Sequence, residues 1–400
     1  MSSIDSARAC FAPTYRQPDL IIERGQGVWL QDHEGRKYLD AIAGIAVNSL
    51  GHNDPELVTA VAEQAGRVTH TSNLYWTAPA MELSERLVRH TFAQVVFFAN
   101  SGAEANEAMI KAARRAHYDA GRCRYEFITA TNSFHGRTMA TVTLTGQPKY
   151  HAGFEPMLPG VGYVPYGDLE AMERAVGEHT AAILVEPIQG EGGVVEPPAG
   201  YLAGLRELAD RTGCYLLFDE VQTGAGRTGH FLAAEHEGVA PDGASLAKGL
   251  GGGLPIGAFL AGPALAECLV PGTHASTFGG NPVACAAANV VVKRLMDEGL
   301  LEHVRAMGGE LDCALAPCME PGGLAVRLRG RGLLRGLELT GAALPNLPAV
   351  ARRHGLMIGM VAGGQVVRLA PPLVITADEV RELAMRLIAS IEEARREASA

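Results

Sequence analysis

The middle of the chain alternates short apolar runs with amphipathic segments of helical period. Helical patterns separate several of the runs, for example over residues 104–121 and 200–213. Alternating strands and helices predict an α/β fold with a largely parallel sheet between helices. In such a sheet, ligands bind beyond the carboxyl ends of the strands. The apolar runs are 95–99, 126–130, 181–186, 215–220 and 244–248.

The pattern of apolar and polar residues differs on either side of this region. Residues 20–50 alternate apolar and polar positions around glycine-containing turns, which predicts a β-hairpin. Toward the C-terminus, helical patterns and short strand patterns are typical of a smaller α+β unit. We therefore predict a large domain over 58–295, and a small domain formed by residues 1–57 together with residues 296–400.

Composition and charge exclude several classes of protein. The formal net charge of -10 argues against a surface that binds nucleic acid or anionic membranes. The most apolar segment, residues 283–292, is too short to span a membrane and is typical of a buried helix. The seven dispersed cysteines and the absence of a signal-peptide pattern predict a cytoplasmic protein with reduced thiols.

The first group of candidate functional residues follows the apolar run at 95–99. Ser101 and Glu104 have the spacing of a capping box at the start of a helix. Gly102 leaves this helix start sterically open, so its free N–H groups could also hold a phosphate. A cap and a phosphate seat are compatible, and both interpretations stay open.

The second candidate is the polar loop after the run at 126–130. Phe134 lies in this loop, where its ring could either pack into the core beneath the loop or stack on a flat ligand. Arg137 is either a solvated surface residue or a bidentate hydrogen-bond donor to a carboxylate. The residues alone do not separate these alternatives.

The third candidate closes the run at 215–220. Asp219 ends a stretch of apolar residues and could pair with a protonated ring nitrogen, although a charge at a strand end can also simply reach water. Gln222 follows one turn later and could donate to a neighbouring oxygen.

Lys248 lies between an apolar run and a series of glycines. It does not belong to a nucleotide-binding P-loop, because Ala247 precedes it and Gly249 follows it. A lysine in an apolar, glycine-lined site loses its charge readily and can form a Schiff base with a carbonyl. An amine, a phosphate seat, a stacking ring and an acid for a ring nitrogen together describe pyridoxal phosphate.

The sequence predicts no metal site. None of the 13 histidines forms an H-E-x-x-H motif, and His230 and His236 do not have the spacing of a helix face. Glu186 and Glu191 are spaced like a possible acid/base pair, but Pro187 lies between them and the sequence leaves their geometry open.

Taken in order, these motifs resemble those of class III pyridoxal-phosphate-dependent aminotransferases, of fold type I, over almost the whole chain. The resemblance implies a mostly parallel seven-stranded sheet between helices in the large domain. It is greatest for acetylornithine aminotransferases, with succinylornithine transaminases close behind. The motifs are NSGAEANEAMIKAAR, FHGRT, EPIQGEGG, FDEVQTGAGRTG, LAKGLGGGLPIGA and STFGGNP.

The resemblance also implies how pyridoxal phosphate is held. Lys248 would bind it covalently and later move the proton, Asp219 would keep its ring nitrogen protonated, and Phe134 would stack on its ring. The active site would lie at the interface of a homodimer. The other implied cofactor contacts are Ser101, Gly102, Ala103, Glu220, Val221, Gln222 and, from the partner subunit, Thr277.

The implied substrates are N-acetylornithine and 2-oxoglutarate or glutamate. Arg137, with Ser276 beside it, would bind the distal carboxylate of the substrate. Arg368 would bind the α-carboxylate of 2-oxoglutarate or glutamate, and Glu191 would cover Arg368 when the ω-amino substrate is bound. The ornithine aminotransferases have a tyrosine in the segment that reads AGIAVN here, so its absence disfavours free ornithine.

Three alternatives remain to be weighed against this function. Another ω-amino-acid transaminase would share all of these motifs. An aminomutase or decarboxylase would not need two carboxylate-binding arginines, so Arg137 and Arg368 weigh against it. A non-catalytic binding protein would be expected to lose Lys248 or Asp219, and both are present.

Overall fold

The computed structural model describes residues 4, 8–15 and 19–399, and its centre is a seven-stranded sheet. The strand β10 runs antiparallel to both of its neighbours, and the remaining pairs that lie between β9 and β6 are parallel. The prediction of a mostly parallel seven-stranded sheet is therefore confirmed. Across the sheet the strands are β4 (Val95–Ala99), β10 (Gly257–Ala261), β9 (Gly243–Leu246), β8 (Tyr215–Asp219), β7 (Thr180–Val185), β5 (Glu126–Ala130) and β6 (Val161–Val164).

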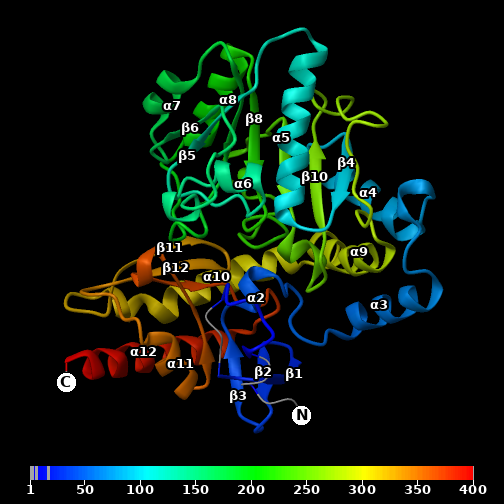
Figure 1. The fold of residues 1–400 in the computed structure, drawn as a ribbon. Coiled ribbons are helices and arrows are strands. Elements are labelled where there is room, and N and C mark those ends of the chain that lie inside the picture. Colours follow the sequence, from blue (N-terminus) through cyan, green and yellow to red (C-terminus); the bar gives the residue numbers. More distant parts are fainter. Residues whose placement is uncertain (1–3, 5–7, 16–18, 400) are drawn as a thin grey trace.

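Helices cover both faces of this sheet because its strands are apolar on both sides (Figure 1). Along β8, Leu216 and Phe218 enter one buried cluster and Leu217 enters the other, as expected where successive side chains point to opposite faces. The first cluster includes α8 (Tyr201–Thr212), and the second includes α5 (Gly102–Asp119).

The two ends of the chain meet in smaller sheets. The predicted hairpin is a three-stranded meander, and the short C-terminal strand β13 (Leu356–Met357) pairs in parallel with its last strand. A second four-stranded sheet is entirely C-terminal. These strands are β1 (Ile22–Gln26), β2 (Trp29–Asp32) and β3 (Lys37–Asp40) in the meander, and β11 (Ala325–Arg331), β12 (Leu334–Leu339), β15 (Val366–Leu369) and β14 (Gly359–Val361) in the second sheet.

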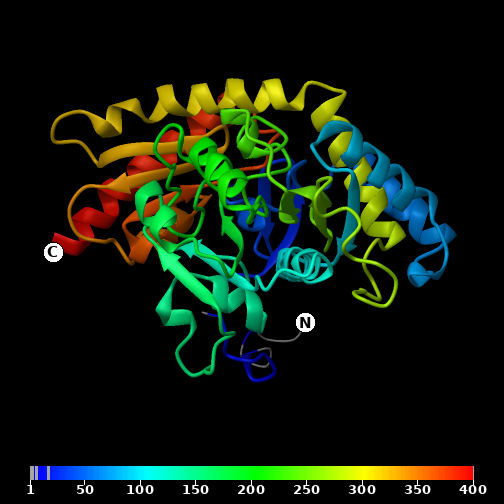
Figure 2. The same cartoon turned by 90° about the horizontal axis from the view of Figure 1, so that it is seen from above.

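The remaining helices connect and cover these sheets. In Figure 1 the N-terminal strands lie beside α11 and α12, below the seven-stranded sheet. Seen from above in Figure 2, the C-terminal part of the chain lies along one side and the helices α3 and α4 lie on the opposite side. The domain boundaries proposed from the sequence stay predictions. The helices are α2 (Ala43–Ala46), α3 (Pro55–Arg67), α4 (Ala78–His90), α6 (Met139–Leu144), α7 (Leu169–Ala175), α9 (Pro282–Met296), α10 (Leu300–Leu315), α11 (Leu347–Arg353) and α12 (Ala377–Ser399).

Two local differences from the sequence pattern have clear causes. The helical pattern that continues past residue 295 is broken between α9 and α10, where Gly299 adopts a left-handed φ of 77°. The apolar run at 244–248 is a strand only as far as Leu246, and Lys248 begins a short 3₁₀ turn instead. The lysine therefore lies just beyond the strand, in the loop region where ligands bind.

None of the seven cysteines is paired in a disulfide. Among the residues described here, no helix has the length and apolarity needed to cross a bilayer.

Candidate active site

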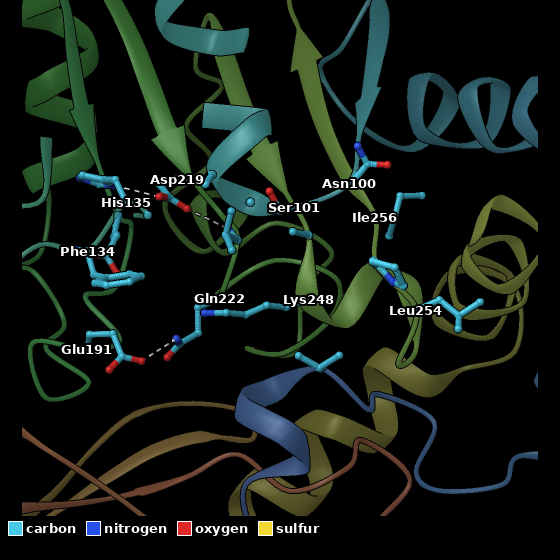
Figure 3. A pocket seen from close by; sticks show the side chains of 18 of the residues that line it. Asn100, Ser101, Phe134, His135, Glu191, Asp219, Gln222, Lys248, Leu254 and Ile256 are labelled. Atoms are coloured by element: carbon cyan, nitrogen blue, oxygen red, sulfur yellow. Dashed lines mark hydrogen bonds and ion pairs between the residues drawn. The ribbon is translucent and has the colours of Figure 1, made fainter. Parts of the chain in front are cut away.

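The loops that follow five strands of the large sheet surround one cleft of about 420 Å³. This is the edge at which the parallel strands present their carboxyl ends. Figure 3 shows Phe134, Asp219 and Lys248 around the same space. The lining includes nine of the predicted site residues, which are Ser101, Gly102, Ala103, Phe134, Glu191, Asp219, Val221, Gln222 and Lys248.

The N-terminus of α5 forms one wall of the cleft. The side chain of Ser101 accepts a hydrogen bond from the Glu104 N–H at 3.2 Å, so Ser101 caps the helix as predicted. The Glu104 carboxylate accepts from the Asn100 N–H at 2.9 Å, one residue earlier than in the predicted capping box. The N–H groups of Gly102 and Ala103 belong to the first turn, so they have no acceptor within the helix and remain available to an anion. The cap and the phosphate seat can therefore coexist.

Two glycines make this wall possible. A Cβ on Gly102 would lie 2.6 Å from the Val221 side chain, and a Cβ on Gly257 would lie 2.2 Å from the Ser101 carbonyl oxygen. The second contact arises because β10 runs antiparallel to β4, so its first residue pairs with the last residue of that strand. The backbone at Gly257 therefore packs directly against the backbone at Ser101, where the helix α5 begins.

Asp219 is 3% exposed and is held from three sides. Its Oδ2 accepts hydrogen bonds from Asn106 Nδ2 at 2.7 Å and pairs with His135 Nδ1 at 2.8 Å, while its Oδ1 accepts from the Val221 N–H at 3.0 Å. The other ring nitrogen of His135 lies 3.1 Å from the Thr129 hydroxyl. These donors satisfy both oxygens of the buried carboxylate and fix its position at the end of β8, where it can face a ring nitrogen of a ligand.

Glu186 connects two loops that line the cleft. Its carboxylate accepts hydrogen bonds from the N–H of Phe134 and from the N–H of Gly190, both at 3.0 Å. Burial raises the pKa of Glu186 to about 7, although the charge of His135 acts in the opposite direction. The backbone that carries the Phe134 ring is therefore tied to the loop that carries Glu191.

Lys248 is strained and electrostatically tuned. Its φ of 41° lies in the left-handed region, which residues with a Cβ adopt uncommonly. Burial lowers the pKa of Lys248, and the charge of Arg368 adds to this effect. Both influences favour a neutral amine, the form that can act as a nucleophile or accept a proton.

Arg368 is a predicted site residue that does not itself line the cleft, but it forms an ion pair with Glu191, which does. Arg368 is only 7% exposed, and its Nη1 also donates to Gln222 Oε1 at 3.2 Å. Burial opposes ionisation of Glu191, but the charge of Arg368 and their hydrogen bond hold the pKa of Glu191 below its ordinary value. Gly190 is required here, because a Cβ at that position would lie 2.1 Å from Gln222 Oε1.

The remaining predicted residues lie outside the cleft lining. Arg137 is exposed and lies over the ring of Tyr150. The Ser276 hydroxyl accepts a hydrogen bond from Asn100 Nδ2 at 3.1 Å, and Thr277 next to it is exposed. Glu220 points away, since its carboxylate accepts hydrogen bonds from Thr223 and from the N–H groups at positions 233 and 234.

Sequence reasoning missed several residues of the site. Asn106 and His135 hold Asp219, but the sequence analysis gave them no role although they lie in the motifs NSGAEANEAMIKAAR and FHGRT. The segment Leu254–Ile256 also lines the cleft, and it was given no role although it lies in the motif LAKGLGGGLPIGA. The signal that could have found His135 is its place beside Phe134, in the loop that follows a central strand.

The residues of the cleft fit pyridoxal phosphate. The first turn of α5 offers N–H groups to a phosphate, Asp219 offers a buried carboxylate to a ring nitrogen, and Lys248 offers an amine to a carbonyl. Across the described residues, no group of three or more His, Cys, Asp and Glu side chains could hold a metal ion.

Comparisons with known proteins agree with this geometry. The model of the family described as aminotransferase class-III matches residues 10–391. The acetylornithine aminotransferase of Myxococcus xanthus is 49% identical over 386 residues, which cover 95% of this chain and 94% of that protein.

Two solved structures are similar over the whole fold. The N-acetylornithine aminotransferase from Stenotrophomonas maltophilia K279a has a TM-score of 0.84 and 38% identity, and covers 99% of this chain and 100% of its own. An ornithine aminotransferase structure from Toxoplasma gondii has a TM-score of 0.93 and 33% identity, and covers 99% of this chain and 95% of its own. That structure has partial occupancy of pyridoxal phosphate at its active site.

The close approach of Gly257 to Ser101 gives a first prediction. We expect Gly257→Ala to destabilise the protein by about 1–3 kcal/mol, because the added Cβ meets backbone that cannot move aside. It should also weaken the binding of pyridoxal phosphate, measured by titrating the apoprotein. Gly177→Ala is the control, since a Cβ there has no heavy atom within 4 Å. Equal stability and cofactor affinity in the two variants would show that Gly257 does not support the seat.

The raised pKa of Glu186 gives a second prediction. The folded protein retains this proton up to a pH of about 7, whereas the unfolded chain releases it near 4.5, so the folded state loses stability as pH rises through this window. Glu186→Gln removes the titration. Wild type should therefore lose stability relative to this variant between these pH values in denaturant unfolding. The exposed residue Glu178 provides a control in Glu178→Gln, and profiles of wild type and Glu186→Gln that ran parallel would contradict the assignment.

Proposed function

Since the chain belongs to the class III aminotransferases, we propose that it moves the δ-amino group of N2-acetyl-L-ornithine to 2-oxoglutarate. The products are N-acetylglutamate semialdehyde and glutamate. Curated relatives named acetylornithine aminotransferase, 45% to 49% identical over nearly the whole chain, support this substrate. The structural observation that carries the proposal is the Arg368–Glu191 pair, because Glu191 lines the same cleft as Lys248 and Asp219.

The residues of the cleft divide the chemical work. Bound pyridoxal phosphate supplies an electron sink for the charge that develops at the substrate carbon. The Asp219 carboxylate keeps a proton on the ring nitrogen, and the ring of Phe134 covers one face. The Nζ of Lys248, whose pKa is lowered by burial, would carry the proton from the substrate carbon to the carbon of the cofactor.

Two different substrates must fit this one cleft. Acetylornithine presents an amino group and no carboxylate at its reacting end and a carboxylate at its distal end, whereas 2-oxoglutarate presents a carboxylate at both ends. We assign Arg137 to the distal carboxylate of both substrates and Arg368 to the second carboxylate of 2-oxoglutarate. When acetylornithine binds, Glu191 pairs with Arg368, so that no uncompensated charge remains buried.

The activity is tested with the purified holoenzyme and 2-oxoglutarate against a panel of N-acylated and free diamino acids. We expect N-acetylornithine to have the highest kcat/KM, with free ornithine far behind. Transfer from succinylornithine with a clearly higher kcat/KM would replace the proposed substrate, and release of carbon dioxide without glutamate formation would replace the reaction class.

The division between the arginines makes the same experiment sharper. Arg368→Ala removes a charge-assisted interaction worth about 1.5–3 kcal/mol, so the half-reaction with 2-oxoglutarate should slow about 10- to 150-fold. The half-reaction with acetylornithine should be spared, and Arg137→Ala should impair both. Equal losses in both half-reactions for Arg368→Ala, followed by single-turnover absorbance, would contradict the switch.

We further propose that the chain acts as a homodimer with its active site at the interface. An exposed apolar surface lies next to the segment that carries Thr277, because Asn73 Nδ2 donates to the Ser276 carbonyl at 2.6 Å and the rings of His70 and Phe278 are 5.0 Å apart. Such a surface is typical of a protein interface. Its large exposed side chains are Leu74 at 79%, Tyr75 at 74%, Trp76 at 88% and Phe278 at 59%.

Sedimentation tests the dimer. Trp76→Lys places a charge in the proposed interface and should shift the protein toward monomers with loss of activity. Tyr118→Lys is a matched control, since Tyr118 is 76% exposed near the far end of α5. A wild-type protein that sediments as an active, cofactor-loaded monomer would rule out the proposal.

A further inference from the structure

Arg137 carries its charge on the face of an aromatic ring. Its Cζ lies 3.8 Å from the centroid of the Tyr150 ring and 5.5 Å from that of Phe134, which lines the cleft. Arg137 is exposed and forms no ion pair with any carboxylate in the described part of the chain. The aromatic contacts therefore place this guanidinium at the edge of the cleft without the help of an acid.

The kind of contact matters for binding a carboxylate. A cation–π contact uses the face of the guanidinium, whereas its N–H groups point outward in the plane. An acid partner would instead occupy those N–H groups and compete with the substrate. Arg137 resting on Tyr150 thus keeps a free edge that can grip a carboxylate through two parallel hydrogen bonds.

The Tyr150 ring is itself held in place by its backbone. Tyr150 ends the short turn Pro148–Tyr150, and its N–H donates to the Gln147 carbonyl at 2.9 Å. The side-chain amide of Gln147 donates to the Ser133 carbonyl at 3.0 Å, which ties this turn to the loop that carries Phe134 and Arg137.

Two further bonds join the same segments. The Asn132 N–H donates to the Gly146 carbonyl at 2.8 Å, and the Gly146 N–H donates to the Ser133 hydroxyl at 2.9 Å. The Tyr150 ring also meets Phe134 edge-on, with centroids 5.9 Å apart and an interplanar angle of 82°. The position of Tyr150 is therefore fixed relative to the ring that covers the cofactor site.

We propose that Tyr150 is a positioning residue that selects carboxylate-bearing substrates by holding the guanidinium of Arg137. The inference rests on the proposed function, because it needs Arg137 to bind a substrate carboxylate. Tyr150 is not among the residues that line the cleft. Its π face orients Arg137, so loss of that face should weaken carboxylate binding and leave the chemistry at Lys248 unchanged.

The experiment compares Tyr150→Leu with Tyr150→Phe in the holoenzyme. Leucine removes the π face, whereas phenylalanine keeps it and loses only the hydroxyl. The first readout is the affinity for glutarate, a dicarboxylate that has no keto group and cannot react, measured by calorimetry. A cation–π contact of the usual strength predicts an affinity loss of about 3- to 30-fold in Tyr150→Leu and little change in Tyr150→Phe.

The second readout compares N-acetylornithine with N-acetylputrescine, which is the same amine without the carboxylate. We expect Tyr150→Leu to raise KM for N-acetylornithine with nearly unchanged kcat, and to leave kcat/KM for N-acetylputrescine as in wild type. Lys149→Gln is a control, because the Lys149 Nζ also lies over the Tyr150 ring, at 4.7 Å. That variant should behave as wild type if Arg137 is the cation that matters.

The possible outcomes separate this inference from the proposed function. If Tyr150→Leu lowers kcat/KM equally for both amines, or binds glutarate like wild type, Tyr150 does not select through Arg137. If Tyr150→Phe loses as much as Tyr150→Leu, the hydroxyl and not the π face is responsible, and the inference is overturned. A wild-type enzyme that fails to use N-acetylornithine but binds glutarate through Arg137 would contradict only the proposed substrate.

Discussion

The buried carboxylate of Asp219 is the constraint around which the cleft is organised. A charge at the end of a central strand and 3% exposed is costly unless donors surround it, and here Asn106, His135 and the Val221 N–H meet it. These donors come from α5, from the loop after β5 and from the loop after β8. Satisfying one carboxylate therefore fixes the relative positions of the anion seat, the Phe134 ring and the strand that carries the acid.

The other charges of the cleft are balanced against one another. Burial lowers the pKa of Lys248 most, and the charge of Arg368 lowers it further. The same arginine pairs with Glu191 and holds the pKa of that carboxyl below its ordinary value. Under the proposed function, a substrate carboxylate that took the place of Glu191 would leave this balance nearly unchanged, because one negative charge would replace another. An exchange of partners at Arg368 would then let one cleft accept two substrates that differ by one carboxylate.

The apolar runs in the sequence predicted five strands of the large sheet and the residues that end them, but they did not include β6 and β10. The apolar runs that precede Asp219 and Lys248 are adjacent strands, and their carboxyl ends meet as expected for a parallel sheet. The sequence could not supply contacts between distant segments. The link from Glu186 to the N–H groups of Phe134 and Gly190, and the cation–π contact between Arg137 and Tyr150, depend on how loops pack and leave no periodic signal. The role assigned to Thr277 depends on a second subunit.

The central claim is that Asp219 keeps the ring nitrogen of pyridoxal phosphate protonated. Nitrogen-15 NMR of the holoenzyme, loaded with cofactor labelled at this nitrogen, measures the protonation directly. The account predicts a protonated nitrogen in wild type at neutral and mildly basic pH, and a deprotonated one in Asp219→Asn, which keeps the shape of the side chain but loses its charge. An unprotonated nitrogen in wild type, or the same chemical shift in both proteins, would contradict it.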